Sequence, residues 1–297
     1  MLYRQIEQNR RKTVLLVLLF GLLVLATGAA IGYLDDGDPV FGLVLAAIFL
    51  AFYLPFTWLS ASRQVLGMAG ARLVSREEYP QLYNIVEELC IPARLPMPKI
   101  YIVDDPSPNA FATGLKPEKG AVAFTTGLLE RLNREELEGV AAHELAHIRN
   151  YDIRLMTISI ALISVIIVLA DIGVRMLMVR RGGGNRKGSG SNPVMLIVAL
   201  VLVILAPIAA RIVHFAISRN REYLADATAV EFTRNPAGLK NALRKIAESD
   251  LDVRKAKQAT APLYFASPFN KERKKRRAGL FDTHPPIEAR IERLERM

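Results

Sequence analysis

The hydrophobic residues of this chain are concentrated in long runs without charge. Residues 14–34 form the first run, and a helix of about 21 residues reaches roughly 31 Å, enough to cross the hydrocarbon core of a membrane. Residues 40–62 form a second uncharged run after the acidic turn 35–39. The pattern therefore predicts a hairpin of two transmembrane helices over residues 13–62.

Basic residues flank this hairpin on both sides. Arg10, Arg11 and Lys12 precede the first run, and Arg63 follows the second. Because cationic residues remain on the cytoplasmic side, the N-terminus (1–12) and the chain after the hairpin are expected in the cytoplasm of a cell whose inner or plasma membrane holds the spans. The first run is longer than a secretory signal, so we interpret it as a retained anchor.

Two further apolar runs, 155–179 and 193–217, occupy most of segment 154–217. Asp171 and Arg175 interrupt the first of them at a spacing that allows pairing on one helix face. The Gly-rich linker 180–192 between the runs is basic, which conflicts with simple topology. We favour two full spans, giving about four transmembrane helices, over a hairpin that enters the bilayer only partly.

The remaining sequence, 63–153 and 218–297, has globular character. Ser75 and Glu78 resemble a capping box before an apolar helix, and Asn133, with Glu136 three residues on, is expected to cap the helix that carries His143. Strands are expected at 99–103, 109–113 and 121–125. Later helices are expected to begin at Pro236 and near Ile287. We therefore expect an α+β fold that is mostly α, with a small sheet and one globular domain formed by two separate parts of the chain.

Charge and cysteine content narrow the choice of partners. The net charge is +10, but the cations flank apolar runs, so we expect contact with anionic lipid and no nucleic acid. The basic stretch 271–277 is interpreted mainly as a solvated loop. The single cysteine, Cys90, excludes an internal disulfide framework and is expected to be a small buried residue.

His143, Glu144 and His147 form the strongest chemical signal. The two histidines are four residues apart on the predicted helix, so they share a face and can bind one zinc ion. Glu144 lies beside the first ligand and can act on a water at the metal without binding the metal itself. The alternative is a chance pair of surface histidines, which this apolar helix makes improbable.

A catalytic zinc site needs a third protein ligand and an open position. Glu222 is our candidate, and Asp226, four residues on, could fix a ligand imidazole by a hydrogen bond. A solvated acidic helix face explains the same pattern equally well. Three expected ligands plus a base favour a catalytic site over an inactive zinc-stabilised scaffold, which would have four closed ligands.

Three other features are candidates for roles in catalysis. His284 or Arg290 could stabilise the oxyanion of a tetrahedral intermediate, and an ordinary turn histidine is the alternative for His284. Asn109, Ala110, Phe111 and Ala112 could bind an extended peptide along a strand edge, and an ordinary sheet strand is the alternative.

The sequence resembles the HtpX-type membrane metalloproteases, relatives of the CAAX prenyl protease, over nearly its whole length. The segments that carry the resemblance are Pro108 to Gly114, His143 to Asp152, Arg221 to Asp226 and Thr283 to Pro286, together with the paired N-terminal spans. The resemblance implies a gluzincin site with His143, His147 and Glu222 on one zinc and Glu144 as base. It also supports Asp226 behind the ligands, His284 and Arg290 as stabilisers and 109–112 as the substrate edge.

The resemblance further implies an endopeptidase that degrades misfolded or damaged membrane proteins. A CAAX-type prenyl-protein protease fits less well, because that type has more spans and a longer chain. A basic adaptor that recruits nucleic acid or lipid is a rival from another class, and it predicts salt-dependent binding that ignores chelators. The sequence sets no expectation for oligomeric state.

Overall fold

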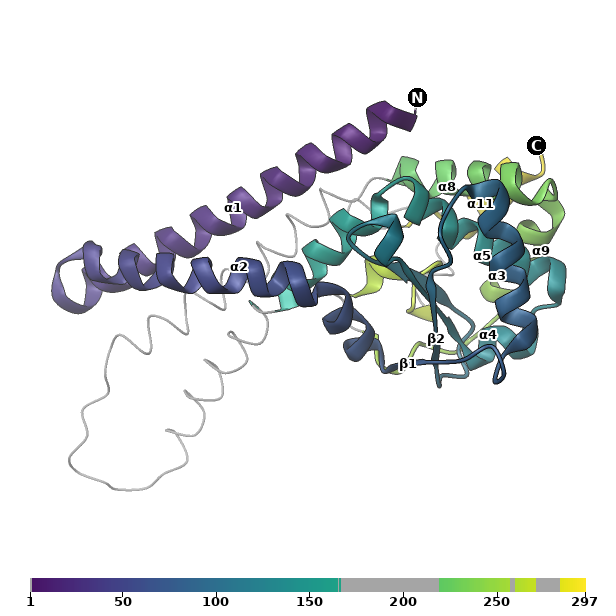
Figure 1. Cartoon of the computed structure of the whole chain (residues 1–297), viewed down its shortest axis with the longest axis horizontal. Coiled ribbons are helices and arrows are strands. Elements are labelled where there is room, and N and C mark those ends of the chain that lie inside the picture. The colour runs from purple at the N-terminus through teal and green to yellow at the C-terminus, as the bar shows by residue number, and fades with distance from the viewer. Residues whose placement is uncertain (1, 165, 167–218, 257–259, 271–283) are drawn as a thin grey trace, which may run out of the picture.

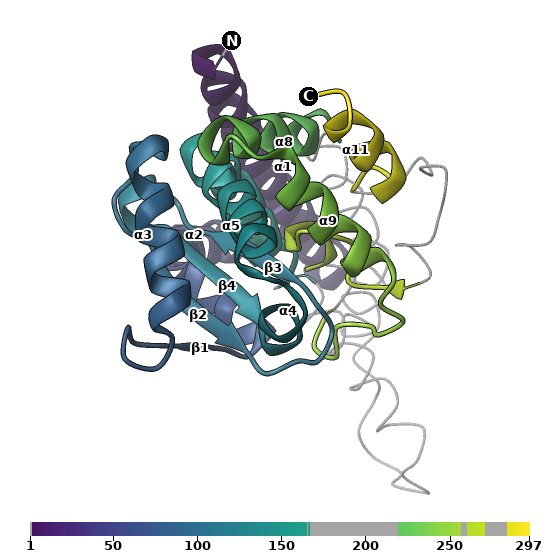
Figure 2. The same ribbon diagram turned by 90° about the vertical axis from the view of Figure 1, so that its right-hand side faces the viewer.

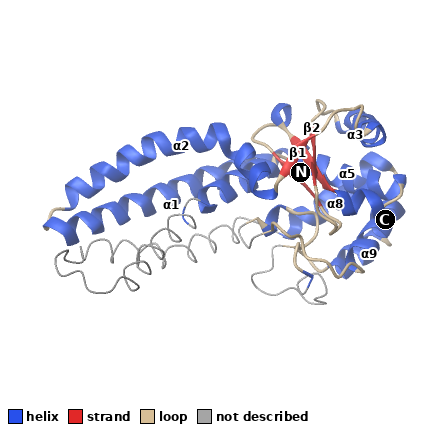
Figure 3. Ribbon diagram, turned by 90° about the horizontal axis from the view of Figure 1, so that it is seen from below, coloured by secondary structure: helices blue, strands red, loops and turns tan. Residues whose placement is uncertain are grey.

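Two long helices form a hairpin that projects from a globular body (Figures 1 and 3). They are α1 (Leu2–Asp36) and α2 (Pro39–Ala69), and the computed structural model describes residues 2–164, 166, 219–256, 260–270 and 284–297. Asp38 caps α2 by accepting a hydrogen bond from the backbone N–H of Val40 at 2.9 Å. Both helices are long and apolar enough to cross a membrane, as the sequence predicted.

Small residues allow α1 and α2 to pack closely. Gly28 and Gly32 of α1 face Gly42 of α2, and a Cβ atom added at any of the three would overlap backbone of the other helix. This is the packing mode by which small residues join membrane helices. Large apolar side chains on the outer faces remain exposed, with Leu22 at 63% and Phe52 at 77%, which suits contact with lipid.

A four-stranded sheet begins directly after the hairpin. Its strands are β1 (Ala71–Leu73), β2 (Lys99–Val103), β3 (Ala110–Thr113) and β4 (Ala121–Thr125), in the order β1-β2-β4-β3. β2 and β4 are parallel, and the two outer strands are antiparallel to their neighbours. The sequence predicted β2, β3 and β4 within one residue but not β1, which has three residues and no fully buried side chain.

The two faces of the sheet pack against different parts of the chain. Side chains alternate along a strand, so Ile100 and Ile102 face one side while Val103 faces the other. The first face packs against α3 (Pro80–Ala93) and α5 (Arg134–Arg149). The second face packs against the end of α2. The base of the hairpin is therefore part of the core of the globular body.

Helix α5 lies at the centre of the body, between α3 and α9 (Figure 2). The helices of the second half that surround it are α8 (Arg219–Thr233), α9 (Pro236–Ala247) and α11 (Ile287–Leu294). Three short helices lie elsewhere in the body: η1 (Pro117–Lys119), α4 (Thr126–Arg131) and η2 (Ala261–Leu263).

The two helix starts that the sequence predicted from their caps have different outcomes. Asn133 and Glu136 form both reciprocal hydrogen bonds at the start of α5. The prediction that a helix starts after Ser75 is wrong, because α3 begins at Pro80. Glu78 does accept a hydrogen bond from the Ser75 N–H, but around a turn. Proline is favoured in a first helical turn because its fixed φ suits that position, which explains the later start.

The described residues include the start of the predicted third span and none of the predicted fourth span. Residues 152–164 are helical and include the start of the run 155–179. The rest of that run, the linker 180–192 and the run 193–217 lie outside the described residues, so the number of spans stays a prediction.

Candidate metal centre

Helix α5 places His143, Glu144 and His147 in the interior. Its capping box fixes the start of the helix, and apolar residues such as Val140 and Leu145 are fully buried against the sheet and neighbouring helices. All three polar side chains are buried as a result. Buried polar groups are unfavourable unless they have hydrogen-bond, charged or metal partners. The neighbours of these three side chains therefore show what the site can bind.

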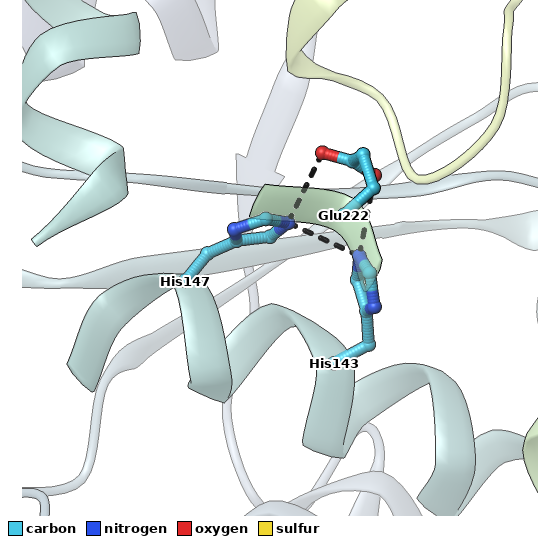
Figure 4. Close-up of side chains that lie close together, drawn as sticks. All are labelled: His143, His147 and Glu222. Carbon is cyan, nitrogen blue, oxygen red and sulfur yellow. Dashed lines mark hydrogen bonds and ion pairs between the residues drawn. The ribbon is translucent and has the colours of Figure 1, made fainter. Parts of the chain in front are cut away.

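Glu222 of α8 completes a triangle with the two imidazoles (Figure 4). The Nε2 atoms of His143 and His147 are 3.1 Å apart. The carboxylate oxygens of Glu222 lie 3.7 Å from His143 Nε2 and 3.6 Å from His147 Nε2. The structure thus brings together the three residues that the sequence proposed as metal ligands, although α5 and α8 are far apart in the chain.

The separations within the triangle fit a single ion. Two ligand atoms about 2.1 Å from a tetrahedral zinc lie about 3.4 Å from each other, and the three observed distances are close to that value. Within the described part of the chain, the buried atoms Glu144 Oε1 and Glu222 Oε2 have no hydrogen-bond partner. A cation, and water bound beside it, would satisfy such atoms.

Charged partners hold His143 from behind. Asp226 Oδ1 lies 2.9 Å from His143 Nδ1, and Arg290 donates to both oxygens of Asp226, at 2.6 and 2.9 Å. Burial opposes a charge on His143, but its interactions with Asp226 and Glu222 outweigh this and raise the pKa of the imidazole to about 9. Burial also opposes a charge on Asp226 and so raises its pKa. The guanidinium of Arg290 outweighs this effect and lowers the pKa of Asp226 below its ordinary value. The expected contact between Asp226 and a ligand imidazole is present.

Asp152 holds His147 in the same way, and sequence reasoning assigned it no role. Its Oδ2 atom lies 3.1 Å from His147 Nδ1. The helix breaks at Tyr151, whose φ of 59° is left-handed, and the chain resumes as a helix at residue 152. The available signal was an acidic residue five positions after the second histidine, but helical spacing does not predict a contact across such a break.

The environment of Glu144 differs from that of Glu222. Burial raises the pKa of Glu144 above its ordinary value, against the lowering effect of the two histidines. Burial also raises the pKa of Glu222, but His143 and His284 hold it well below the ordinary range. Two buried carboxyl groups with opposite shifts are typical of sites where one binds charge and the other exchanges a proton.

His284 and Phe265 border the triangle. His284 Nδ1 lies 3.5 Å from Glu222 Oε2, and the opposite ring nitrogen is within hydrogen-bond distance of the Ala261 carbonyl, at 3.2 Å. The ring of Phe265 packs edge-on against His143, with 4.9 Å between ring centroids. His284 therefore lies at the site, and Phe265 is a neighbour that the sequence did not indicate.

The predicted substrate edge is partly occupied by the chain itself. β3 is an outer strand of the sheet, but Ala110 accepts a hydrogen bond from the Phe265 N–H at 2.8 Å. The side chain of Asn109 holds Ala266 by donating to its carbonyl and accepting from its N–H, at 3.0 and 3.3 Å. Binding of substrate along 109–112 stays a prediction, and it requires the segment 264–266 to give way.

The sequence of the chain has clear relatives among known proteins. Residues 76–297 match the sequence profile of Peptidase family M48. The chain belongs to peptidase family M48. A protease HtpX homolog from Listeria monocytogenes serotype 4a is 52% identical over the full length of both chains, and one from Ligilactobacillus salivarius is 48% identical, also over both full lengths.

This M48 member is therefore a metalloprotease, and its two apolar helices and HtpX relatives make it a membrane protein. Among solved structures, Ste24p of S. mikatae aligns with a TM-score of 0.48 and 15% identity, covering 99% of this chain and 67% of the other.

Replacement of Arg290 by methionine is expected to destabilise the metal-free protein. Among the described residues, the change leaves the buried Asp226 carboxylate with His143 as its one remaining partner, which corresponds to a loss of folding stability of about 3–5 kcal/mol. Thermal unfolding in detergent with chelator present measures the effect without a contribution from bound metal.

Arg293→Met is the matched control, three residues further along α11. Its guanidinium is exposed and stacks on Tyr223 at 4.0 Å, an interaction worth about 0.5–1 kcal/mol. Equal losses of stability in the two variants would show that the buried Arg290–Asp226 pair stabilises the fold no more than the exposed Arg293 does.

Proposed function

We propose that the chain is a zinc-dependent endopeptidase in which His143, His147 and Glu222 hold one zinc ion per chain. The observation that carries the proposal is the buried triangle of two imidazole nitrogens and a carboxylate at separations of 3.1, 3.6 and 3.7 Å. Two nitrogens and one oxygen are the donor set of many catalytic zinc sites, which keep a fourth position for water or substrate.

When bound, zinc supplies Lewis-acid chemistry, polarising the scissile carbonyl and making water more acidic. Glu144 accepts the proton of the attacking water and passes it to the leaving amine. Its unpartnered buried oxygen and raised pKa support this role. Asp226 and Asp152 keep the proton of each imidazole on Nδ1, which leaves Nε2 of both rings unprotonated and able to hold a zinc ion.

We assign different tasks to His284 and Arg290. His284, beside Glu222, stabilises negative charge that develops on the carbonyl oxygen during attack. All three guanidinium nitrogens of Arg290 already donate hydrogen bonds, two to Asp226 and one to the Phe265 carbonyl. Arg290 therefore acts on the reaction through Asp226 and through its positive charge, which lies 3.9 Å from Glu222.

The preferred substrates in this proposal are misfolded or damaged membrane proteins. The support is the proximity of the site to the hairpin: Asn9 of α1 contacts Asp152, which contacts His147. A polypeptide that leaves the bilayer beside α1 would therefore emerge close to the site. The resemblance to the HtpX type points to the same role in quality control.

The Glu144→Gln variant is expected to bind zinc as the wild type does while losing cleavage by roughly 10²–10⁴-fold, because an amide cannot accept the proton of the attacking water. Zinc content and cleavage are measured on detergent-purified protein, with casein and with a destabilised membrane protein as substrates.

Two comparisons complete this experiment. Chelation should abolish wild-type cleavage, and added zinc should restore it. Normal turnover by Glu144→Gln would reject the mechanism, and equal cleavage of the folded and destabilised forms of the membrane substrate would reject the quality-control role.

We also propose that substrate pairs as an extended strand with Ala110 to Ala112, displacing the backbone contact from Phe265. The support is the position of β3 at the outer edge of the sheet and beside α5. A peptide with a photoreactive benzophenone, bound to Glu144→Gln, is expected to crosslink to the peptide that contains β3. Crosslinks confined to other parts of the chain would contradict this placement.

Finally, we propose that the protease domain faces the cytoplasm and the turn at Asp38 faces outward. An impermeant maleimide should label Asp38→Cys in intact cells and Ile91→Cys only after permeabilisation. Ile91 is suitable because it is 78% exposed on α3. The native Cys90 gives little background because it is buried and burial raises the pKa of its thiol to about 11. The reverse labelling pattern would invert the topology.

A further inference from the structure

The N-terminal helix reaches the metal centre through a buried polar residue. Asn9 lies on α1, five residues before the uncharged run that begins at Val14, and its side chain is buried. Its amide nitrogen donates to Asp152 Oδ1 at 2.6 Å. The other oxygen of Asp152 meets His147 Nδ1 at 3.1 Å, so one carboxylate joins the membrane helix to a candidate metal ligand.

Further contacts hold α1 in place at this point. Asn9 also donates to the backbone carbonyl of Asn150 at 3.4 Å, and the guanidinium of Arg10 lies 5.6 Å from the centre of the Tyr151 ring. Together with Asp152, these two partners are three consecutive residues that join α5 to the helix at 152–164. The N-terminal part of α1 therefore contacts the short segment that places Asp152 beside His147.

The buried face of α1 continues this contact towards the membrane. Asn9, Thr13, Leu16 and Phe20 recur at helical spacing and are all buried. Leu16 and Phe20 share an apolar cluster with Leu155, Ile158 and Leu162, which lie on the helix that begins at residue 152. Apolar packing thus sets the position of α1, and Asn9 is the polar group at the end of that face.

The position of Asp152 depends on few donors. Within the described part of the chain, its carboxylate accepts hydrogen bonds from the side chains of Asn9 and His147. Its nearest cation there is Arg221, with 3.8 Å between Nη1 and Oδ1. A buried carboxylate with one strong donor removed loses both solvation and orientation. His147 would then lose the partner that fixes its ring and its Nδ1–H tautomer.

We propose that Asn9 is a positioning residue of the metal centre, which acts on His147 through Asp152. This rests on the proposed function, in which His147 is a zinc ligand. It makes the affinity for metal depend on the docking of the first membrane helix. It also gives a chemical reason for a buried amide on α1 just before the apolar span.

The test is zinc affinity, measured by competition with a chelator on the full-length protein in detergent. Asn9→Ala is expected to weaken zinc binding by about tenfold, the lower end of the range for groups that hold ligand side chains. Asn9→Gln keeps an amide donor and should recover part of the loss. Cobalt-substituted protein should show an altered visible spectrum for Asn9→Ala, because the imidazole changes its orientation.

Thr13→Ala is the matched control. Thr13 is buried on the same face of α1, one turn further on, and its hydroxyl donates only to the Asn9 carbonyl within α1 among the described residues. It should leave zinc affinity and the cobalt spectrum unchanged. A loss of affinity in Thr13→Ala equal to that in Asn9→Ala would overturn the proposal, since helix packing alone would then explain both.

A double-mutant cycle tests whether the effect passes through Asp152. Asp152→Ala should weaken zinc binding by about 10–100-fold, and adding Asn9→Ala should cause no further loss. Additive losses would overturn the proposed route. If Asp152→Ala does not fold, the comparison of Asn9→Ala with Thr13→Ala still decides the question.

Reference variants separate this inference from the proposed function. His147→Ala and Glu222→Ala should each reduce zinc affinity more than Asn9→Ala does. If neither reduces it, the assignment of the metal ligands is wrong. If both reduce it while Asn9→Ala matches wild type, the ligands stand and only the role of Asn9 is rejected.

Discussion

Two carboxylates on one face of α8 lie in the interior of the protein, and the architecture around them follows from the need to compensate their charge. Glu222 and Asp226 are both almost inaccessible to solvent. An isolated buried carboxylate is strongly unfavourable, so each requires cationic or hydrogen-bonding neighbours. Arg290 and the imidazoles of α5 supply them. The packing of α5, α8 and α11 against one another is therefore tied to the chemistry of the site.

Most of the site could be predicted because its geometry is local to two helices. His143 and His147 share a face through their spacing of four, and so do Glu222 and Asp226. What spacing could not provide was the distance between the two helices, because that depends on packing between segments remote in sequence. The family resemblance supplied this link, and the distances between the side chains now support it.

The features that escaped prediction are those set by long-range contacts. β1 is too short and too exposed to have an alternating pattern of its own. Asp152 reaches His147 only because the chain breaks at Tyr151, and Asn9 reaches Asp152 only because the first turns of α1 lie against the body. The pairing of Phe265 with β3 joins two segments separated by about 150 residues. In each case the local pattern is weak and the tertiary structure decides.

The packing of α2 under the sheet has a consequence for how the enzyme can be handled. Val65, Leu66 and Ala69, at the base of this helix, share an apolar cluster with Val103 and Phe111 of the sheet. Severing the chain after the hairpin would expose that face of the sheet to water and invite aggregation. The globular body is thus not an independent domain that is merely attached to a membrane hairpin. Hairpin and body therefore share one core, and an excised soluble fragment would lack the α2 side chains that cover this face of the sheet.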